Sequence, residues 1–152
     1  MQQPHKSAFA LPLISTLLLS SAHAAPQTIT LRCDGVQKRT ETIGGENPKV
    51  LTAPASLTYV IDLEQRTVKD QNGHVMKASI SQDVIRFAHE SKLEVPGDPN
   101  TQVSSTTRIN GSINRVTGLL FDARTVNSTI GKIKSSAEAI TNGECAQSNS
   151  KF

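Results

Sequence analysis

The stretch Thr28-Ile29-Thr30-Leu31-Arg32-Cys33 (TITLRC, residues 28–33) alternates strictly between polar and apolar side chains. A repeat of two residues is typical of a β-strand that buries one of its faces. The alternation places Ile29, Leu31 and Cys33 on the same face. The stretch therefore predicts a half-buried strand that carries a cysteine on its buried side.

Further β-like segments follow along the chain, and turn signals separate them. They are residues 56–61, 66–69, 75–80, 84–87, 101–109, 119–124 and 130–140. None shows a sustained helical period, although the composition of residues 134–140 would also suit a short helix. The pattern predicts an all-β domain of about eight strands in an antiparallel meander, either closed as a lipocalin-like barrel or packed as a sandwich.

Two segments predict loops because they are rich in glycine and proline. One is residues 91–100. The other is residues 35–54, in which a short strand could form near residues 37–42. The turn-forming residues of this second segment are Gly35, Gly44, Gly45, Pro48 and Pro54.

Residues 1–24 have the layout of a secretory signal peptide. A short basic start precedes an apolar core at Phe9–Leu19, and Ala22-His23-Ala24 matches the small-x-small pattern that precedes cleavage. The apolar core is too short for a transmembrane helix, which needs about 20 such residues; an amphipathic N-terminal helix is the alternative. We expect cleavage after Ala24, a single β domain over residues 25–152 with no transmembrane segment, and a periplasmic or secreted location.

The two cysteines, Cys33 and Cys145, lie near opposite ends of that domain. In the oxidising compartments that exported proteins enter, an even pair of cysteines usually forms a disulfide. Their Cα atoms would then lie about 4.4–6.8 Å apart, and the first and last strands would be neighbours. The pair therefore favours a closed sheet. A redox role is not expected, because the chain has no Cys-x-x-Cys motif.

The composition argues against nucleic acid as a partner. The formal net charge of +3 falls to +2 without Lys6, which is the one charged residue of the predicted signal peptide. The predicted domain has no tryptophan, and its few aromatic residues are Tyr59, Phe87, Phe121 and Phe152. Modules that bind single strands stack the bases on exposed aromatic side chains, and this chain offers few of them.

The segment Ser112–Arg124 (SINRVTGLLFDAR) contains an arginine, a threonine and a glycine between two apolar runs. Asn114 can begin a turn by accepting a backbone N–H two residues on. Thr117 can cap the same loop, and Gly118 can adopt a positive φ where the chain enters the next strand. The segment therefore predicts a hairpin with a turn built on Asn114, Thr117 and Gly118.

Arg115 lies in the middle of that predicted turn. It could be displayed for an anionic ligand, or it could be an ordinary solvated side chain. Residues 61–68 have a similar layout, with Asp62 in the place of Asn114, and this repetition favours a structural role for the motif. Arg115 remains the candidate ligand-binding residue.

The order of four short motifs resembles that of small exported proteins of Gram-negative bacteria. The motifs are L-x-C-x-G at residues 31–35, V-I-D at 60–62, I-N-R-V-T-G at 113–118 and G-x-C at 143–145. The resemblance implies export and an all-β fold, and it implies no activity. The first motif is also similar to the start of periplasmic inhibitors of C-type lysozyme, which are small disulfide-linked barrels. Their inhibitory Ser-Gly-x-x-Tyr loop is missing from this sequence, so the inhibitor role is not implied.

Catalytic and metal-binding patterns are weak. His74 and His89 are the histidines of the predicted domain, and Ser81 and Asp83 lie between them. These residue types could form a serine-hydrolase triad, but no G-x-S-x-G motif is present. Neither histidine has a second histidine or a cysteine at the spacing of a zinc site. We expect no cofactor and no metal.

These observations favour a non-catalytic β-domain of the cell envelope that binds a protein or a small ligand. One alternative is a small hydrolase with its site near His74 and His89. Another is an envelope-structural protein without a ligand. A hydrolase requires its nucleophile, base and acid to converge in one pocket, which the fold can test.

Overall fold

The computed structural model of the chain describes residues 28–148, so the predicted signal peptide lies outside the described part. Within these residues, no helix is long and apolar enough to cross a membrane. The strands are β1 (Thr28–Ile43), β2 (Lys49–Asp62), β3 (Thr67–Asp70), β4 (Val75–Ile80), β5 (Val84–Val95), β6 (Val103–Asn114), β7 (Leu119–Ile130) and β8 (Ile133–Gln147).

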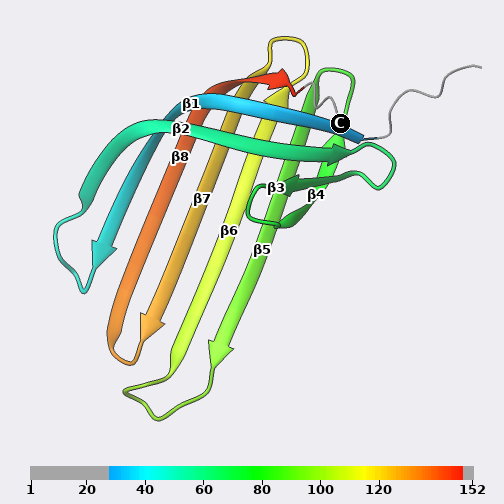
Figure 1. Cartoon of the computed structure of the whole chain (residues 1–152). Coiled ribbons are helices and arrows are strands. Elements are labelled where there is room, and N and C mark those ends of the chain that lie inside the picture. Colours follow the sequence, from blue (N-terminus) through cyan, green and yellow to red (C-terminus); the bar gives the residue numbers. More distant parts are fainter. Residues whose placement is uncertain (1–27, 149–152) are drawn as a thin grey trace, which may run out of the picture.

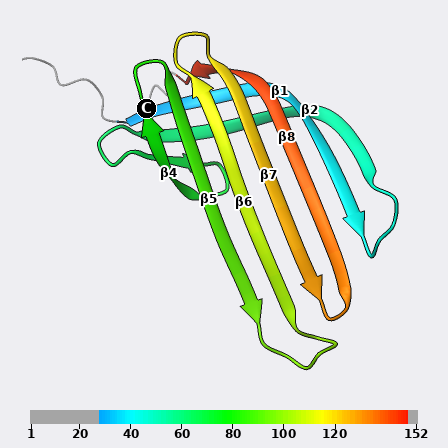
Figure 2. The same ribbon diagram turned by 180° about the vertical axis from the view of Figure 1, so that it is seen from behind.

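Each strand pairs antiparallel with the next one along the chain, and β8 returns to pair with β1. The strands therefore close a barrel in simple up-and-down order, which Figures 1 and 2 show from opposite sides. The prediction of an antiparallel meander of eight strands is confirmed. Of the two expected forms the chain adopts the barrel, in which the first and last strands pair with each other.

β1 runs unbroken through the first part of the segment that was expected to be a loop. Gly35 does not end the strand, because it pairs with Gly143 of β8. A Cβ on Gly35 would collide with the backbone of Asn142. Two facing glycines thus let the backbones of β1 and β8 approach closely at this pair. The glycine that predicts a loop lies within a strand.

β2 begins at Lys49, so residues 49–54 are strand and only residues 44–48 remain as loop. Pro54 fits because its nitrogen faces a free edge. The N–H of Thr58, four residues later and on the same side of the strand, donates to the side chain of Gln71 and not to β1. Proline has no N–H to donate, and within sheets it is confined to such edges.

Two other segments also differ from the sequence-based expectation. Residues 91–95, expected in a loop, continue β5 and pair with β6. Residues 134–140, which could have formed a helix, belong to β8 and pair with β7 on one side and β1 on the other. Pairing with neighbouring strands overrides the weak local preference of these residues.

The closed part of the barrel holds the hydrophobic core. Its buried members are Cys33, Leu57, Tyr59, Ile61, Val68, Met76, Ile85, Phe87, Ile109, Ile113 and Leu120. The ring centroids of Tyr59 and Phe87 are 5.3 Å apart. A Cβ on Gly111 would overlap the ring of Phe87, so a glycine at this position makes room for the aromatic pair.

The long strands extend beyond the short ones. β2 pairs with β3 only through its last four residues, and β5 pairs with β4 only through Ile85–Ala88. Figures 1 and 2 show β5 to β8 and the second half of β1 reaching well past β3 and β4. We call this part the extension. It comprises residues 89–95 of β5, 103–109 of β6, 124–130 of β7, 133–139 of β8 and 39–43 of β1.

Candidate functional site at the open end of the barrel

One face of the extension continues the interior of the barrel. The strand pairs run residue for residue without a bulge, so alternate side chains stay on the same side along each strand. Phe87 of β5 and Asp122 of β7 are buried in the barrel. Residues two, four and six positions further along these strands face the same way. We call this side the inner face and the opposite side the outer face.

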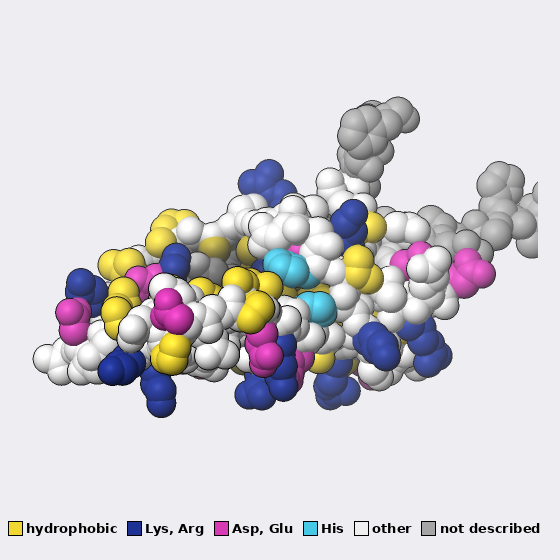
Figure 3. Space-filling view, turned by 90° about the horizontal axis from the view of Figure 1, so that it is seen from below, with side chains coloured by type: hydrophobic (Ala, Val, Ile, Leu, Met, Phe, Trp, Pro, Cys, Tyr) yellow, Lys and Arg dark blue, Asp and Glu magenta, His cyan; other side chains and the backbone are white. Residues whose placement is uncertain are grey.

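The inner face of the extension is largely apolar and exposed, and its charged residues on β1 are Arg39 and Glu41, which form an ion pair. Its large hydrophobic side chains are between 36% and 58% exposed. They are Ile43, Leu93, Val95, Val126, Ile130 and Ile133. Small side chains lie between them, and the hydroxyls of Ser105 and Ser128 are 3.0 Å apart. A hollow of about 200 Å³ lies among β1, β7 and β8. Figure 3, seen from below, shows hydrophobic side chains (yellow) on this side of the molecule, interspersed with charged and polar ones.

The outer face of the extension has the opposite character. It carries charged and polar side chains: Thr40, Glu90, Lys92, Glu94, Arg108, Thr125, Asn127, Lys134 and Glu138. An antiparallel sheet usually turns its polar face to water and its apolar face to the core. In the extension, no other element within residues 28–148 covers the hydrophobic side chains of the inner face.

Two strand edges border the inner face, and both are protected against pairing with another strand. One is the edge of β5 at residues 89–95, where Glu90, Lys92 and Glu94 project from the outer face. The other is the edge of β2 before its pairing with β3, where Pro54 has no N–H to donate. Charged side chains and proline are common devices that prevent edge-to-edge association. Charges therefore oppose pairing along the edge of β5, and proline opposes it at one position of the β2 edge, whereas the largely apolar face between them is open.

A chain of polar side chains crosses the barrel interior where the extension begins. The hydroxyl of Tyr59 donates to Oδ2 of Asp122 at 2.7 Å. Arg124 donates from Nε and Nη2 to Asp122, and from Nη1 to Oδ2 of Asp70 at 2.7 Å. Asp70 also lies 3.1 Å from Nδ1 of His74. We call these five residues the polar cluster.

The polar cluster is fully paired and carries a net negative charge. Burial and the charge of Asp122 raise the pKa of Tyr59, so its hydroxyl stays a donor. Burial by itself would lower the pKa of Arg124, but the hydrogen bonds and charge of Asp122 raise it. Burial by itself would raise the pKa of Asp70, but hydrogen bonds from His74 and Arg124 lower it. Two carboxylates thus surround one guanidinium, which leaves one negative charge when His74 is neutral.

His74 and His89 come together at this junction. Their ring centroids are 5.9 Å apart, and Figure 3 shows histidine side chains (cyan) among hydrophobic ones. Ser81 and Asp83 do not join them, because they lie in the β4–β5 turn, where the hydroxyl of Ser81 donates to the carbonyl of Val84. No hydrogen bond within residues 28–148 links a hydroxyl to either ring. The fold brings together two histidines and Asp70, without a nucleophile in contact.

The hairpin residues lie at the other end of the barrel, in the β6–β7 turn. Oδ1 of Asn114 accepts two backbone N–H groups of the turn, each at 2.9 Å. Oγ1 of Thr117 accepts the N–H two residues on at 3.4 Å. Gly118 has a φ of 75°, and a Cβ there would lie 2.8 Å from the carbonyl oxygen of Cys145. The β2–β3 turn uses the same device, with Oδ1 of Asp62 accepting a backbone N–H three residues on.

Arg115, the candidate for anion binding, reaches across to the neighbouring turn. Its Nη1 donates to the carbonyl oxygen of Ser81 at 2.7 Å. Its backbone N–H donates to the carbonyl oxygen of Asp83, also at 2.7 Å. It also lines a mostly apolar hollow of about 300 Å³ at this end of the barrel. These bonds tie the β6–β7 turn to the β4–β5 turn, and they occupy part of the guanidinium.

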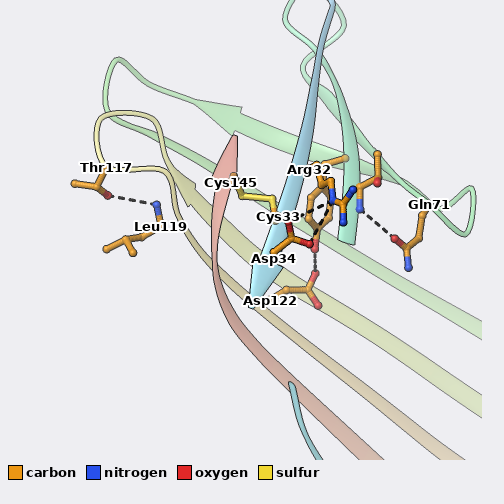
Figure 4. Close-up of a disulfide and its surroundings, with 10 residues drawn as sticks. Arg32, Cys33, Asp34, Gln71, Thr117, Leu119, Asp122 and Cys145 are labelled. Atoms are coloured by element: carbon orange, nitrogen blue, oxygen red, sulfur yellow. Dashed lines mark hydrogen bonds and ion pairs between the residues drawn. A yellow bond between two sulfur atoms is a disulfide. The ribbon is translucent and has the colours of Figure 1, made fainter. Parts of the chain in front are cut away.

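Cys33 and Cys145 form the predicted disulfide. The bond joins β1 to β8, as Figure 4 shows, and Asp122 of the polar cluster lies nearby. The Cα atoms are 3.9 Å apart, closer than expected. The N–H of Cys145 donates to the carbonyl oxygen of Gly118, on the β7 side, and not to Cys33. Cys33 and Cys145 are therefore a non-hydrogen-bonded pair, which is the antiparallel pair type with the shorter Cα–Cα distance. The bond indicates an oxidising compartment.

The sequence patterns do not point to the polar cluster as a unit, because its members come from strands far apart in the chain. One signal was present in the segment Leu120–Arg124. Asp122 and Arg124 alternate in step with the apolar Leu120, so a strand that buries Leu120 buries them too. Charged residues are rarely buried unless they are paired, and such positions are candidates for an internal network.

Comparison of the chain with known protein families, with curated proteins and with solved structures finds no significant match in any of the three.

Proposed function

We propose that the protein is an exported, non-catalytic binding domain that holds the acyl chain of a lipid against the inner face of the extension. The proposal rests on one observation: the exposed large hydrophobic side chains of the extension lie on the inner face, while its outer face is polar. Apolar patches of this kind mark binding surfaces on soluble proteins.

The size of the inner face suits a long apolar ligand. Seven residues of a strand span roughly 20 Å, so an extended acyl chain can lie along β5 to β8. Covering six side chains that are about half exposed contributes on the order of 5 kcal/mol, before the cost of association. The small side chains between them, such as Ser105 and Ser128, leave room for a chain to settle between the larger ones.

The guarded edges favour an acyl chain over an added peptide strand. A peptide that extends a sheet needs free backbone donors and acceptors at an edge. The charges on β5 and Pro54 on β2 oppose that mode of binding. A hydrocarbon chain makes no such bonds and needs only the face.

The histidines support the hydrolase alternative less well. His74 and His89 lie near each other, but the hydroxyl of Ser81 is engaged with the backbone of its own turn. A hydrolytic site needs a nucleophile within hydrogen-bond reach of its base. Binding without catalysis therefore fits the observed contacts better.

Export is the second part of the proposal. It is supported by the disulfide and by the signal-like layout of residues 1–24, and we infer a periplasmic location. Mass spectrometry of the protein from its host is expected to show Ala25 at the N-terminus. An intact Met1 on cytoplasmic protein would contradict export and leave the binding proposal standing.

Ligand binding can be tested with a fluorescent fatty acid whose emission rises in apolar surroundings. The wild-type protein is expected to bind it saturably. Val126→Asp on the inner face should weaken binding at least tenfold, because it places a charge beside the acyl chain. Asn127→Asp, the next residue on the same strand, introduces the same carboxylate on the outer face and should leave binding unchanged.

Thermal melts of both variants serve as the folding control, and neither should unfold, because both positions are exposed. Equal weakening by the two variants would contradict binding at the inner face. Failure of the wild-type protein to bind the probe would also refute the proposal and favour the envelope-structural alternative. Binding of apolar peptides in place of the acyl probe would identify a protein ligand.

A further inference from the structure

We propose that His74 and His89 together bind a divalent transition-metal ion at the open end of the barrel, with copper(II) held most tightly. His74 directly precedes β4 and His89 belongs to β5, so the site is assembled only by the fold. The proposal does not rest on acyl binding, because it needs no lipid, although His89 lies at the start of the inner face.

Asp70 orients His74 in the way that metal-binding histidines are usually oriented. The carboxylate of Asp70, 1% exposed, lies 3.1 Å from Nδ1 of His74 and also accepts the backbone N–H of His74 at 2.9 Å. An ionised carboxylate can only accept, so Nδ1 carries a proton, and the tautomer that binds a metal would do so through Nε2. A carboxylate behind a histidine fixes the ring and increases its basicity as a ligand.

The charge beneath the rings favours a cation. Asp70 and Asp122 share the single guanidinium of Arg124, which donates to both. The two carboxylates therefore carry one negative charge more than this guanidinium balances, next to the two imidazole rings. An anion placed between the rings would be repelled by this charge, whereas a divalent metal ion would be attracted to it.

The spacing of the rings is compatible with one shared ion. With a metal–nitrogen bond of about 2.0–2.1 Å, the centroids of two imidazoles on one ion lie roughly 4.5 Å apart when the ligands are at right angles and roughly 6.4 Å apart when they are opposed. Here they are 5.9 Å apart, within this range. The side chain of His74 is 40% exposed, so water can reach the site.

No group of three His, Cys, Asp or Glu side chains in residues 28–148 is arranged to hold a metal. Water would therefore complete the coordination, and the site would be open. Imidazole nitrogen suits copper, zinc and nickel, and copper(II) ranks first among them in affinity.

The test uses the full chain with His5 and His23 replaced by glutamine, so that His74 and His89 are its only histidines. Copper(II) is titrated as a weak chelate, and binding is followed by electron paramagnetic resonance. We expect one equivalent bound with the signature of two imidazole nitrogens, and competition by excess zinc(II). His74→Gln and His89→Gln should each weaken binding at least tenfold.

Glu90→Gln is the matched control, because it removes a carboxylate that follows His89 in the sequence but lies on the outer face, outside the proposed site, and it should leave the affinity unchanged. Thermal melts of each variant check that it is folded. Copper binding that survives both histidine substitutions would overturn the proposal. So would loss of binding in only one of the two variants, or a spectrum with a single imidazole nitrogen.

Discussion

Asp70 and Asp122 are carboxylates that the barrel interior accepts because both are paired. Both residues are buried, and each accepts hydrogen bonds from Arg124. An unpaired buried charge costs several kcal/mol, and removing one partner of a buried pair is strongly destabilising. The hydroxyl of Tyr59 adds a further bond to Asp122. These few side chains therefore join β2, β3 and β7 across the open end of the core.

Tyr59→Phe is expected to lower the free energy of unfolding by about 1–3 kcal/mol. It deletes one donor to Asp122 and leaves a buried carboxylate oxygen with fewer partners. Urea unfolding followed by circular dichroism measures the change. Thr58→Ala, at the half-buried neighbouring position on the opposite face of β2, should change it by less than about 0.5 kcal/mol. An unchanged midpoint for Tyr59→Phe would mean that Arg124 alone satisfies Asp122.

Gly118→Val is expected to cost more than about 1 kcal/mol, because a β-branched side chain is strained at positive φ. Its Cβ would also lie 2.8 Å from the carbonyl oxygen of Cys145. Arg115→Ala should cost no more than about 1 kcal/mol, since it removes one exposed hydrogen bond to Ser81. Denaturant melts of both variants compare the two. A larger loss from Arg115→Ala would show that the tie between the two turns dominates stability at this end.

At the scale of the element, β5 combines two environments in one strand. Its first residues pair with both β4 and β6, whereas residues 89–95 pair with β6 alone. On this free edge, inner-face positions such as Leu93 are apolar and outer-face positions are charged. The charges prevent another strand from extending the sheet, while the apolar side chains remain available to a ligand that binds the face.

Replacing Glu90, Lys92 and Glu94 together by threonine is expected to promote self-association, because the variant presents an uncharged edge of high β propensity. Size-exclusion chromatography over a range of concentrations would detect dimers or larger species. A triple threonine variant at the exposed outer-face positions Arg108, Asn127 and Glu138, away from the edge, should stay monomeric. A monomeric edge variant would show that the charges on β5 are not what protects the edge.

At the scale of the whole molecule, closure of the barrel depends on two strands from opposite ends of the chain. β1 and β8 pair over Leu31–Ile43 and Ser135–Gln147, and the disulfide crosses this seam between residues separated by 112 positions. Linking such distant residues restricts the unfolded chain and stabilises the folded one, by roughly 4–5 kcal/mol in the chain-entropy model. Closure also removes two edges that would otherwise be open.

Reduction of the disulfide should lower the melting temperature by roughly 10–20 °C, given the usual relation between stability and melting temperature for a domain of this size. Scanning calorimetry with and without a reductant measures the shift. A Cys33→Ser/Cys145→Ser variant should melt near the reduced protein and should not respond to the reductant. Two free thiols on denatured, unreduced protein from an oxidising compartment would show that the bond does not form there.

The limits of sequence-based prediction are clearest in β1 and β2. Gly35 and Pro54 are turn formers, and locally they predict a loop. In the fold, Gly35 faces Gly143, and the Pro54 nitrogen points to an edge that needs no donor. Both outcomes depend on a partner strand, or on the absence of one, and no local pattern contains that information.

The sequence by itself determined the all-β class, the antiparallel meander and the Cys33–Cys145 bond. Alternation with a period of two is a local property of each strand, and two cysteines allow only one intramolecular pairing. Only the tertiary structure decided how far each strand extends and which side chains meet at the open end. Strand length depends on ladder partners, and the contact of Asp70 with Arg124 spans 54 positions of sequence. Closure of the barrel brings such distant residues together, and it is also what leaves the inner face of the extension uncovered.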